Sequence, residues 1–322
     1  MVLPAVTAFL IRRIGQAAAV VMGVMVLTFV LIHLEPGSAA RAALGPHVTA
    51  GRIAIFNSTY GLNEPLYRQF GGYLAQVARG NLGTSYALQQ PVSTLIAQRL
   101  PRDLLLLGVS TALALILALP LGLYQALRRN RPGDYVFTGI AFTLYSMPDF
   151  LLAIALIAVF CVQLRLLPPE APQATTVTGL LADPRALILP VLTLALVSVA
   201  SFSRYMRSSA IDTLAQDYIR VARAKGLSRR LILARHVLRN SLLPVITIVG
   251  LSFPAIVAGA VIAEEVFNFP GMGLLFYQAA TSHDFPVLLG STLVVGISTV
   301  IGSLAADIAY AVLDPRIRYG RG

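Results

Sequence analysis

The sequence predicts an all-α membrane protein in which six transmembrane helices form one bundle. Hydrophobic residues make up 57% of the 322 residues and charged residues only 12%, whereas a soluble domain carries about 25% charge. Six long apolar runs follow one another, and most basic residues fall on one side of them. This composition excludes a soluble enzyme, a disordered chain and a disulfide scaffold.

Each expected helix is an apolar run that is long enough to cross a bilayer. About 20 helical residues cover the roughly 30 Å hydrocarbon core. The expected spans are 9–34, 103–127, 135–165, 186–204, 243–263 and 285–311. Arg12 and Arg13 would suit a signal peptide, but the apolar run after them exceeds the usual core of about 7–15 residues. We therefore expect a retained first helix.

Basic residues set the expected orientation. With the N-terminus inside, the inside segments hold 17 of the 25 basic residues, and the outside segments hold 8 in a longer total sequence. Cytoplasmic loops carry such an excess of Arg and Lys. Both termini are therefore expected in the cytoplasm. In a multi-pass protein, the net charge of +11 indicates contact with anionic membrane lipid rather than with nucleic acid.

The first outside segment, 35–101, is expected to form a small subdomain over the outer membrane face. Apolar residues recur at helical spacing from Pro65 to Val77, which predicts an amphipathic helix. Asn57 and Ser58 supply a turn signal before it. The segment therefore has enough local order to cover the bundle.

The inside segment 212–243 is expected to project from the membrane as two helices. The first covers Asp217 to Lys225, Gly226 supplies its C-cap or turn, and Ser228 supplies a new N-cap. The second covers Arg229 to Leu242. Charge alone would favour a basic loop that follows the positive-inside rule, whereas a helix-turn-helix could carry force from a partner.

The order of residues in the inside segment 212–243 can be compared with known sequence motifs. The run DYIRVARAKGLSRRLILARHVLRNSLLP contains Gly226 and ends at Pro244. It resembles the signature loop of ATP-binding-cassette (ABC) importer permeases, and the peptide branch of that family in particular. Of the family's Glu-Ala-Ala triplet only the last alanine is present, at Ala222. The runs YGLNEPLYRQFGGYLAQVARGNLGTSY, EEVFNFPGMG and YAVLDPRIRYG extend the resemblance over nearly the whole chain.

The resemblance implies the type I ABC importer permease fold. It implies the first of two permease subunits of a dipeptide or oligopeptide importer in the cytoplasmic (inner) cell membrane. A second homologous permease would complete the pathway, two ABC ATPase subunits would drive alternating access, and an extracytoplasmic peptide-binding protein would deliver the peptide. ATP and Mg would belong to the ATPases, because this sequence has no P-loop and no cofactor is expected in it.

The same resemblance implies where the ATPases act. Ala222 to Leu227 would form the coupling helix, whose small residues allow a close approach. The expected ATPase-coupling residues are Tyr218, Ala222, Arg223, Ala224, Lys225, Gly226, Leu227 and Pro244.

Polar residues within or next to the spans are candidates for the transport pathway. Asp149 lies about 21 Å along the third span, after Ser146 and after Pro148, which interrupts the helix. The Ser-x-x-Asp spacing suits two roles equally, a cap for a restarted helix or a contact for a peptide amine. Glu264 and Glu265 end the fifth span, where we expect solvated acids; contact with the binding protein or the peptide is the lesser alternative.

Several alternatives stay open from the sequence. The same architecture could import nickel chelates or glutathione. An ion-coupled carrier or channel would need no ATPase, but it would usually show several buried acids or inverted repeats. An intramembrane enzyme would need a catalytic constellation, and none is visible. The four histidines lack metal-ligand spacing, so neither a catalytic residue nor a metal site is expected.

Overall fold

The computed structural model describes residues 3–34, 37–45, 47–252 and 259–313. Within these ranges the chain is helical and carries no strand beyond an isolated bridge between Thr84 and Pro91. The predicted all-α architecture is confirmed. In chain order the elements are α1 (Leu3–Leu34), α2 (Ala39–Leu44), α3 (Ala50–Thr59), α4 (Leu66–Ala78), α5 (Val92–Leu127), α6 (Pro132–Ser146), α7 (Asp149–Ile157), the π-helix η1 (Ala158–Gln163), α8 (Val177–Leu181), α9 (Pro184–Leu214), α10 (Asp217–Ala224), α11 (Arg229–Ile232), the π-helix η2 (Leu233–Leu238), α12 (Arg239–Leu251), α14 (Val261–Val266), α15 (Met272–Thr281) and α16 (Phe285–Leu313).

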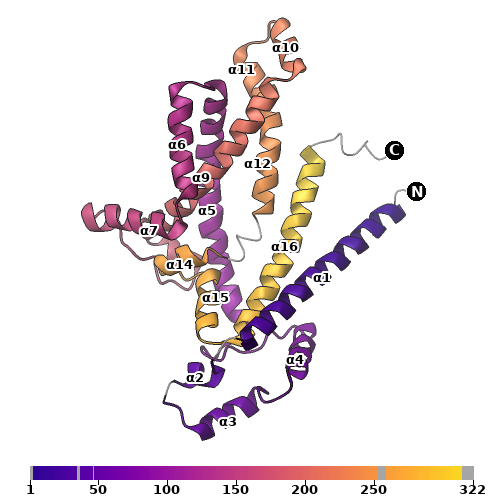
Figure 1. Cartoon of the computed structure of the whole chain (residues 1–322), viewed down its shortest axis with the longest axis vertical. Helices are drawn as coiled ribbons and strands as arrows, with labels where there is room; N and C mark the ends of the chain where they lie inside the picture. The colour runs from indigo at the N-terminus through magenta and orange to yellow at the C-terminus, as the bar shows by residue number, and fades with distance from the viewer. Residues whose placement is uncertain (1–2, 35–36, 46, 253–258, 314–322) are drawn as a thin grey trace.

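The long helices α5 and α9 pack against each other at the centre of the bundle (Figure 1). Their contact is made largely by small side chains, because Ala114 and Ala118 of α5 are buried in one cluster with Ala195 of α9. At Gly122 a Cβ atom would lie only 2.7 Å from the Cβ of Met206. Glycine and alanine therefore let the two backbones approach closely, as is usual between membrane helices.

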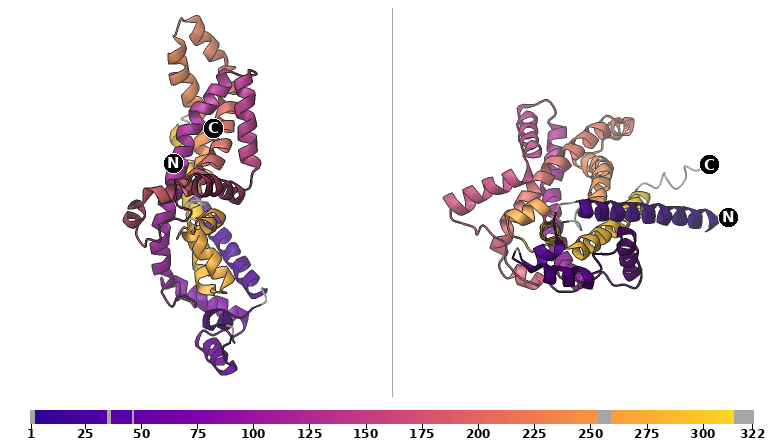
Figure 2. Two further views of the ribbon diagram at one scale, coloured as in Figure 1. Left: turned by 90° about the vertical axis from the view of Figure 1, so that its left-hand side faces the viewer. Right: turned by 60° about the horizontal axis from the view of Figure 1, so that its bottom comes forward.

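A second pair consists of α1 and α16, which lie against each other beside α12 (Figures 1 and 2). A Cβ atom at Gly296 would lie 3.1 Å from a methyl group of Val21, so this crossing is also close. The beginning of α1 and the end of α16 both point away from the layer formed by α2, α3 and α4 (Figure 1). That both termini lie in the cytoplasm stays a prediction.

The helices α2, α3 and α4 form a layer across one end of the bundle (Figure 1). The amphipathic helix that the sequence predicts from Pro65 to Val77 is confirmed as α4. Phe56 and Tyr86 are buried in the small core of this layer. The layer is fastened to the bundle at the start of α16, because the Asp284 carboxylate accepts a hydrogen bond from the Ala87 N–H at 3.1 Å.

Four described helical stretches are long and apolar enough to cross a membrane, namely 92–127, 184–214, 229–250 and 285–302. The bent pair of α6 with α7 and η1 is a fifth candidate, and α1 contains a shorter apolar helix from Ala18 to Leu34. Large apolar side chains such as Leu27, Ile116 and Val136 are exposed, which suits a lipid environment. Six crossings stay a prediction.

The expected third span, 135–165, is not one straight helix. α6 ends at Ser146, and the helical direction turns by 103° before α7 begins at Asp149. α7 consequently runs across the direction of α5 and α6 (Figure 2). Pro148 holds Met147 in an extended conformation with ψ of 128°, because the proline ring disfavours a helical residue before it. The helix break that the sequence predicts at Pro148 is confirmed.

The expected fifth span, 243–263, falls on more than one element. Its first part belongs to α12, which ends at Leu251, and its last residues open α14 at Val261. Residues 253–258 lie outside the described part of the chain. The fourth span is longer than expected, because α9 continues to Leu214 and leads directly toward α10.

Candidate functional site

The α10–α12 hairpin, residues 217–251, lies at the end of the molecule opposite α2, α3 and α4 (Figure 1). Its first helix, α10, is amphipathic. Ile219 and Ala222 lie three residues apart and are buried, while Tyr218 and Val221 are exposed. Positions three apart fall on one helical face. α10 therefore packs on one side against the protein and presents the other side to its surroundings.

A tight turn ends α10 as the sequence predicts. Gly226 has φ of +78°, a left-handed conformation that favours glycine. The Leu227 N–H donates to the carbonyl of Ala222 at 3.2 Å, and the Gly226 N–H donates to that of Arg223 at 2.9 Å. The Ser228 hydroxyl then accepts from the Leu231 N–H at 3.4 Å, which confirms its predicted role as an N-cap.

The segment that the resemblance names as the coupling helix, Ala222 to Leu227, covers the end of α10 and the turn after it. α10 ends at Ala224, one residue before the predicted end at Lys225, and Lys225 and Gly226 form the turn that leads to Leu227. The left-handed glycine is the physical reason, since it reverses the chain and cannot continue a right-handed helix. Of the expected coupling residues, Ala222 is buried; Tyr218, Arg223, Ala224, Lys225, Gly226, Leu227 and Pro244 are exposed.

The returning arm runs without a gap from Arg229 through α11, η2 and α12. It contains a π-helical segment that the sequence did not predict. The two arms are joined by Asn240, whose amide donates to the Tyr218 hydroxyl at 3.0 Å and to the His236 carbonyl at 2.8 Å. Pro244 lies within α12 at an exposed position.

The buried side of the hairpin rests on the ends of α5 and α9. Ile219, Ala222 and Val237 are buried in one apolar cluster with Ala126 of α5 and Ala210 of α9. Such a contact is as closely packed as the rest of a protein interior. A displacement of the hairpin must therefore be accompanied by a displacement of these helix ends.

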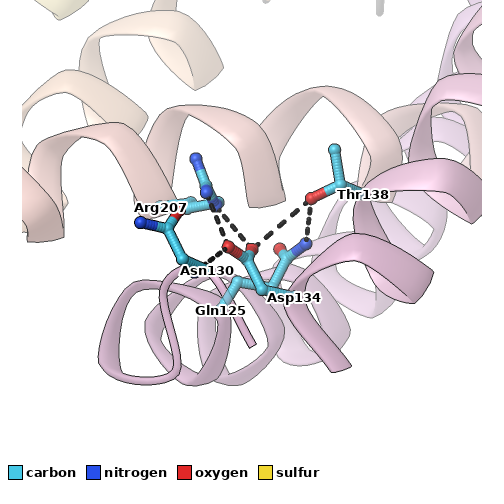
Figure 3. Close-up of polar contacts among 5 residues, drawn as sticks. All are labelled: Gln125, Asn130, Asp134, Thr138 and Arg207. Atoms are coloured by element: carbon cyan, nitrogen blue, oxygen red, sulfur yellow. Dashed lines mark hydrogen bonds and ion pairs between the residues drawn. The ribbon is translucent and has the colours of Figure 1, made fainter. Parts of the chain in front are cut away.

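An ion pair between the buried Asp134 and the partly exposed Arg207 joins α6 to α9 (Figure 3). Arg207 donates through Nε to Asp134 Oδ1 and through Nη2 to Oδ2, both at 2.8 Å. Asp134 also accepts from the Asn130 N–H at 3.0 Å, and Thr138 lies between Asp134 and Gln125 (Figure 3). A bidentate contact between an arginine and a carboxylate fixes both the distance and the relative orientation of the two side chains.

The sequence did not single out this pair, because 73 residues separate Asp134 from Arg207. The available signal was the one acid in the basic turn RRNRPGDY at the start of α6. Asp134 is only 2% exposed, so its charge requires a partner.

The pathway candidates at the helix break lie on its surface. Ser146, Pro148 and Asp149 are all exposed in this subunit. Asp149 is the first residue of α7, where a negative charge is favourable, but α7 has no side-chain hydrogen bond at its N-cap, Pro148. The expected capping role is thus limited to this charge effect.

The two glutamates of α14 differ sharply in their surroundings. Glu265 is exposed, as expected. The expectation that Glu264 is solvated is wrong, because its side chain is 0% exposed. It accepts hydrogen bonds from the Ala260 N–H at 2.6 Å and from the Leu274 N–H at 2.8 Å. The chain folds back through α15 and covers this carboxylate, which a linear pattern does not reveal.

Arg102 and Asp103, at the start of the second expected span, are further buried charges that the sequence did not single out. Asp103 accepts from the Met272 N–H at 2.7 Å. The Arg102 guanidinium donates to the carbonyl oxygens of Pro270 and Thr175, each at 2.9 Å. Both residues thereby hold distant loops against α5. Their signal in the sequence was an adjacent acid and base at the edge of an apolar run.

Within the described ranges, no group of three or more His, Cys, Asp or Glu side chains could hold a metal ion. The hairpin itself offers an exposed face of apolar and basic side chains on a closely packed base. That arrangement can bind a partner and pass on its movement.

Two families of known proteins match the sequence. The family "Binding-protein-dependent transport system inner membrane component" matches residues 118–319, and its N-terminal counterpart, described as "Binding-prot-dependent transport system membrane comp, N-term", matches residues 6–107. Together the matches cover most of the chain, including the α10–α12 hairpin.

Several curated relatives are similar over nearly their whole length. The oligopeptide transport system permease protein AppB of Bacillus subtilis is 39% identical over 314 residues, which are 97% of this chain and 99% of the relative. A putative peptide permease protein of Brucella ovis is 38% identical over 96% of this chain and 98% of the relative. The glutathione transport system permease protein GsiC of Salmonella typhi is 35% identical over 97% of this chain and 99% of the relative.

A solved structure shares the fold. The chain resembles the MetNI methionine ABC transporter in its inward facing conformations, with a TM-score of 0.53 and 16% sequence identity. The match covers 68% of this chain and 96% of that chain. At this identity the likeness concerns the fold, and it confirms the predicted importer-permease architecture.

Proposed function

Because this chain belongs to the family of binding-protein-dependent transport system inner membrane components, we propose that it forms one half of a peptide-import pathway. It is a multi-pass inner-membrane permease of the ABC type. In the proposed complex a second, homologous permease supplies the other half of the pathway. Two ABC ATPase subunits bind ATP and Mg, and an extracytoplasmic binding protein delivers the substrate.

The proposed substrate class is di- and oligopeptides. Its support is the similarity to permeases named for oligopeptides and peptides at 38–39% identity over the full chain. Glutathione is the second candidate, because permeases named for it are 35% identical over the same length. Both candidates carry a free amine and carboxylates, so one pathway chemistry would serve either.

The observation that carries the proposal is the construction of the α10–α12 hairpin. Its outer face presents Tyr218 and Val221 together with basic residues, while Ile219 and Ala222 hold it to the protein. Exposed apolar residues with basic neighbours suit a protein partner better than water. We infer that this face contacts an ATPase subunit and that Ala224 and Lys225 lie within the contact.

Movement of the hairpin would reach the pathway through packed contacts. The hairpin rests on the ends of α5 and α9. α9 holds α6 through Arg207 and Asp134, and α6 leads to the break at Pro148. Closely packed elements move together rather than deform continuously. Closure of the ATPases would thus be converted into alternating access of the pathway.

The proposed pathway residues lie where α6 gives way to α7 and on α14. Ser146, Pro148 and Asp149 are exposed at the break, and Glu265 is exposed on α14, which packs against α7. An exposed acid within a membrane domain is a functional candidate, because lipid cannot solvate it. Asp149 and Glu265 are proposed to meet the amine of the peptide. Glu264 is proposed to have a structural role instead, because its side chain is buried.

The test is coupled transport by the reconstituted complex, with Ala224→Glu as the variant. Ala224 is exposed on the proposed ATPase face, so a larger acidic side chain there should leave folding intact and disturb docking. ATP hydrolysis should then continue or fall without peptide uptake. Ala215→Glu is the matched control, because Ala215 is exposed beyond the end of α9 and outside α10. Equal coupling ratios in the two variants would refute the docking face.

The partners and the substrate require a separate measurement. The tagged protein would be purified gently from its native membrane, and the proteins that accompany it identified by mass spectrometry. A second permease and ATPase subunits with P-loops are expected. Competition of labelled peptide uptake by glutathione would then separate the two substrate classes. Full transport by this chain alone after reconstitution would contradict the importer proposal.

A further inference from the structure

Asp103 of α5 and Glu264 of α14 form a pair of buried carboxylates. Each side chain is 0% exposed. A Cβ atom at Gly271 would overlap both Oδ1 of Asp103 and Oε2 of Glu264, so these two oxygens face the same small space. Glycine at this position keeps that space open. Two buried carboxylates that face each other cannot both stay ionised at low cost.

The hydrogen bonds around the pair are unequal. Both oxygens of Glu264 accept from backbone N–H groups, Oε1 from Ala260 and Oε2 from Leu274. Among the described residues, Asp103 accepts only through Oδ2, from the Met272 N–H. Its Oδ1 is buried and has no hydrogen-bond partner in this part of the chain. A buried oxygen that lacks any donor is unfavourable as part of a carboxylate, whereas a carboxyl group could use the same oxygen as a donor.

The neighbouring arginines do not donate a hydrogen bond to Oδ1 of Asp103 among the described residues. Arg102 is buried, but its guanidinium donates to the carbonyl oxygens of Pro270 and Thr175. Arg99 lies one turn earlier on α5 and is partly exposed. Neither arginine forms an ion pair with Asp103 or Glu264 among the described residues. Between Met272 and Thr281, α15 carries no acidic or basic side chain other than Tyr277, which is exposed.

We propose that Asp103 and Glu264 bind one proton between them, which Asp103 carries on Oδ1 and donates to Oε2 of Glu264. The pair then holds a single negative charge, which the N–H groups of Met272 and Leu274 at the beginning of α15 stabilise. The pair joins α5 to α14 and α15, and the contact between these helices then depends on the bound proton. This inference does not depend on the identity of the transported substrate.

The hydrogen bonds predict that the two isosteric substitutions differ. In Asp103→Asn the amide oxygen can accept from Met272, and the amide nitrogen can donate to Glu264, so this variant reproduces the protonated state. In Glu264→Gln the new N–H₂ group must face a backbone N–H whichever way it turns. Asp103→Asn should therefore unfold at the wild-type temperature, and Glu264→Gln at a lower one. Glu265→Gln is the control, because Glu265 is exposed on the same helix.

Infrared spectroscopy observes the proton directly, because a protonated carboxyl absorbs apart from ionised carboxylates. The purified full chain should show such a band at about pH 8, where an unfolded aspartate is ionised. The band should be lost in Asp103→Asn and kept in Glu265→Gln. Since the folded chain holds a proton that the unfolded chain releases, raising the pH should lower the unfolding temperature, and Asp103→Asn should reduce this dependence.

Three results would overturn the proposal. The first is the absence of a carboxyl band from the wild-type chain at about pH 8. The second is persistence of an unchanged band in Asp103→Asn. The third is destabilisation or misfolding of Asp103→Asn to the same degree as Glu264→Gln, which would identify Asp103 as an ionised acceptor.

Discussion

Removing either member of the ion pair between Asp134 and Arg207 tests whether one buried contact fastens α6 to α9. Two single variants and their combination are needed, Arg207→Gln, Asp134→Asn and the double variant. Arg207→Gln removes the guanidinium and leaves the carboxylate of Asp134 buried. Asp134→Asn keeps the shape of the acid and leaves the arginine without its counter-charge.

The magnitude follows from the unequal exposure of the two side chains. Breaking a buried pair costs about 3–5 kcal/mol, because one charge is left without a partner. Asp134 is 2% exposed, but it keeps the Asn130 N–H at 3.0 Å, so we expect Arg207→Gln to cost about 2–4 kcal/mol. Arg207 is 28% exposed and can be hydrated, so we expect about 1–2 kcal/mol for Asp134→Asn.

The assay is unfolding of the purified full chain in detergent by denaturant, followed through loss of helical circular dichroism. Arg204→Gln is the control, because Arg204 lies one turn away on α9 and its guanidinium stands 4.5 Å from the ring of Tyr145. That contact contributes only about 0.5–1 kcal/mol at an exposed site. The double variant should lose at least about 1 kcal/mol less than the sum of the single losses. Additive losses, or an equal loss in Arg204→Gln, would refute the reasoning.

Three further predictions concern the α10–α12 hairpin, each measured by the same unfolding assay. Gly226→Ala forces a side chain into a left-handed conformation at φ of +78° and should cost about 1 kcal/mol; an unchanged stability would contradict the turn. Tyr218→Phe removes the hydroxyl that accepts a hydrogen bond from Asn240 and should lower the free energy of unfolding by about 0.5–1.5 kcal/mol. In the double variant with Asn240→Ala this hydrogen bond should not be lost a second time, so the loss in the double variant should be smaller than the sum of the two single losses. Ile219→Ala empties a fully buried site and should cost about 2–5 kcal/mol, while the exposed Val221→Ala should change stability by less than about 0.5 kcal/mol.

Local features of the fold were predictable because their causes are local. Pro148 breaks the third apolar segment through its own ring and the residue before it. Gly226 and Ser228 end one helix and start the next through hydrogen bonds that reach no further than five residues. The period of apolar residues likewise placed α4 correctly, since it depends only on spacing along one helix.

Other features depended on residues far apart in the chain and were missed or misjudged. The break at Pro148 was predicted, but its 103° angle follows from the way α7 packs against α9 and α14. Glu264 and Glu265 are adjacent and chemically identical, yet α15 covers only the first of them. Identical neighbours cannot be separated by composition or spacing, because burial is decided by what packs on each side of the helix.

The sequence by itself determined an apolar helical membrane protein with a basic, capped hairpin and the family to which it belongs. Each of these features depends on a continuous segment of sequence, in which residue spacing, capping residues and residue order act over one or two helical turns. Only the tertiary structure decided that Asp134 meets Arg207, that Asp103 faces Glu264, and which side of α10 is buried. Buried charges find partners wherever folding brings them together, and that proximity is a property of the packed chain rather than of any segment in it.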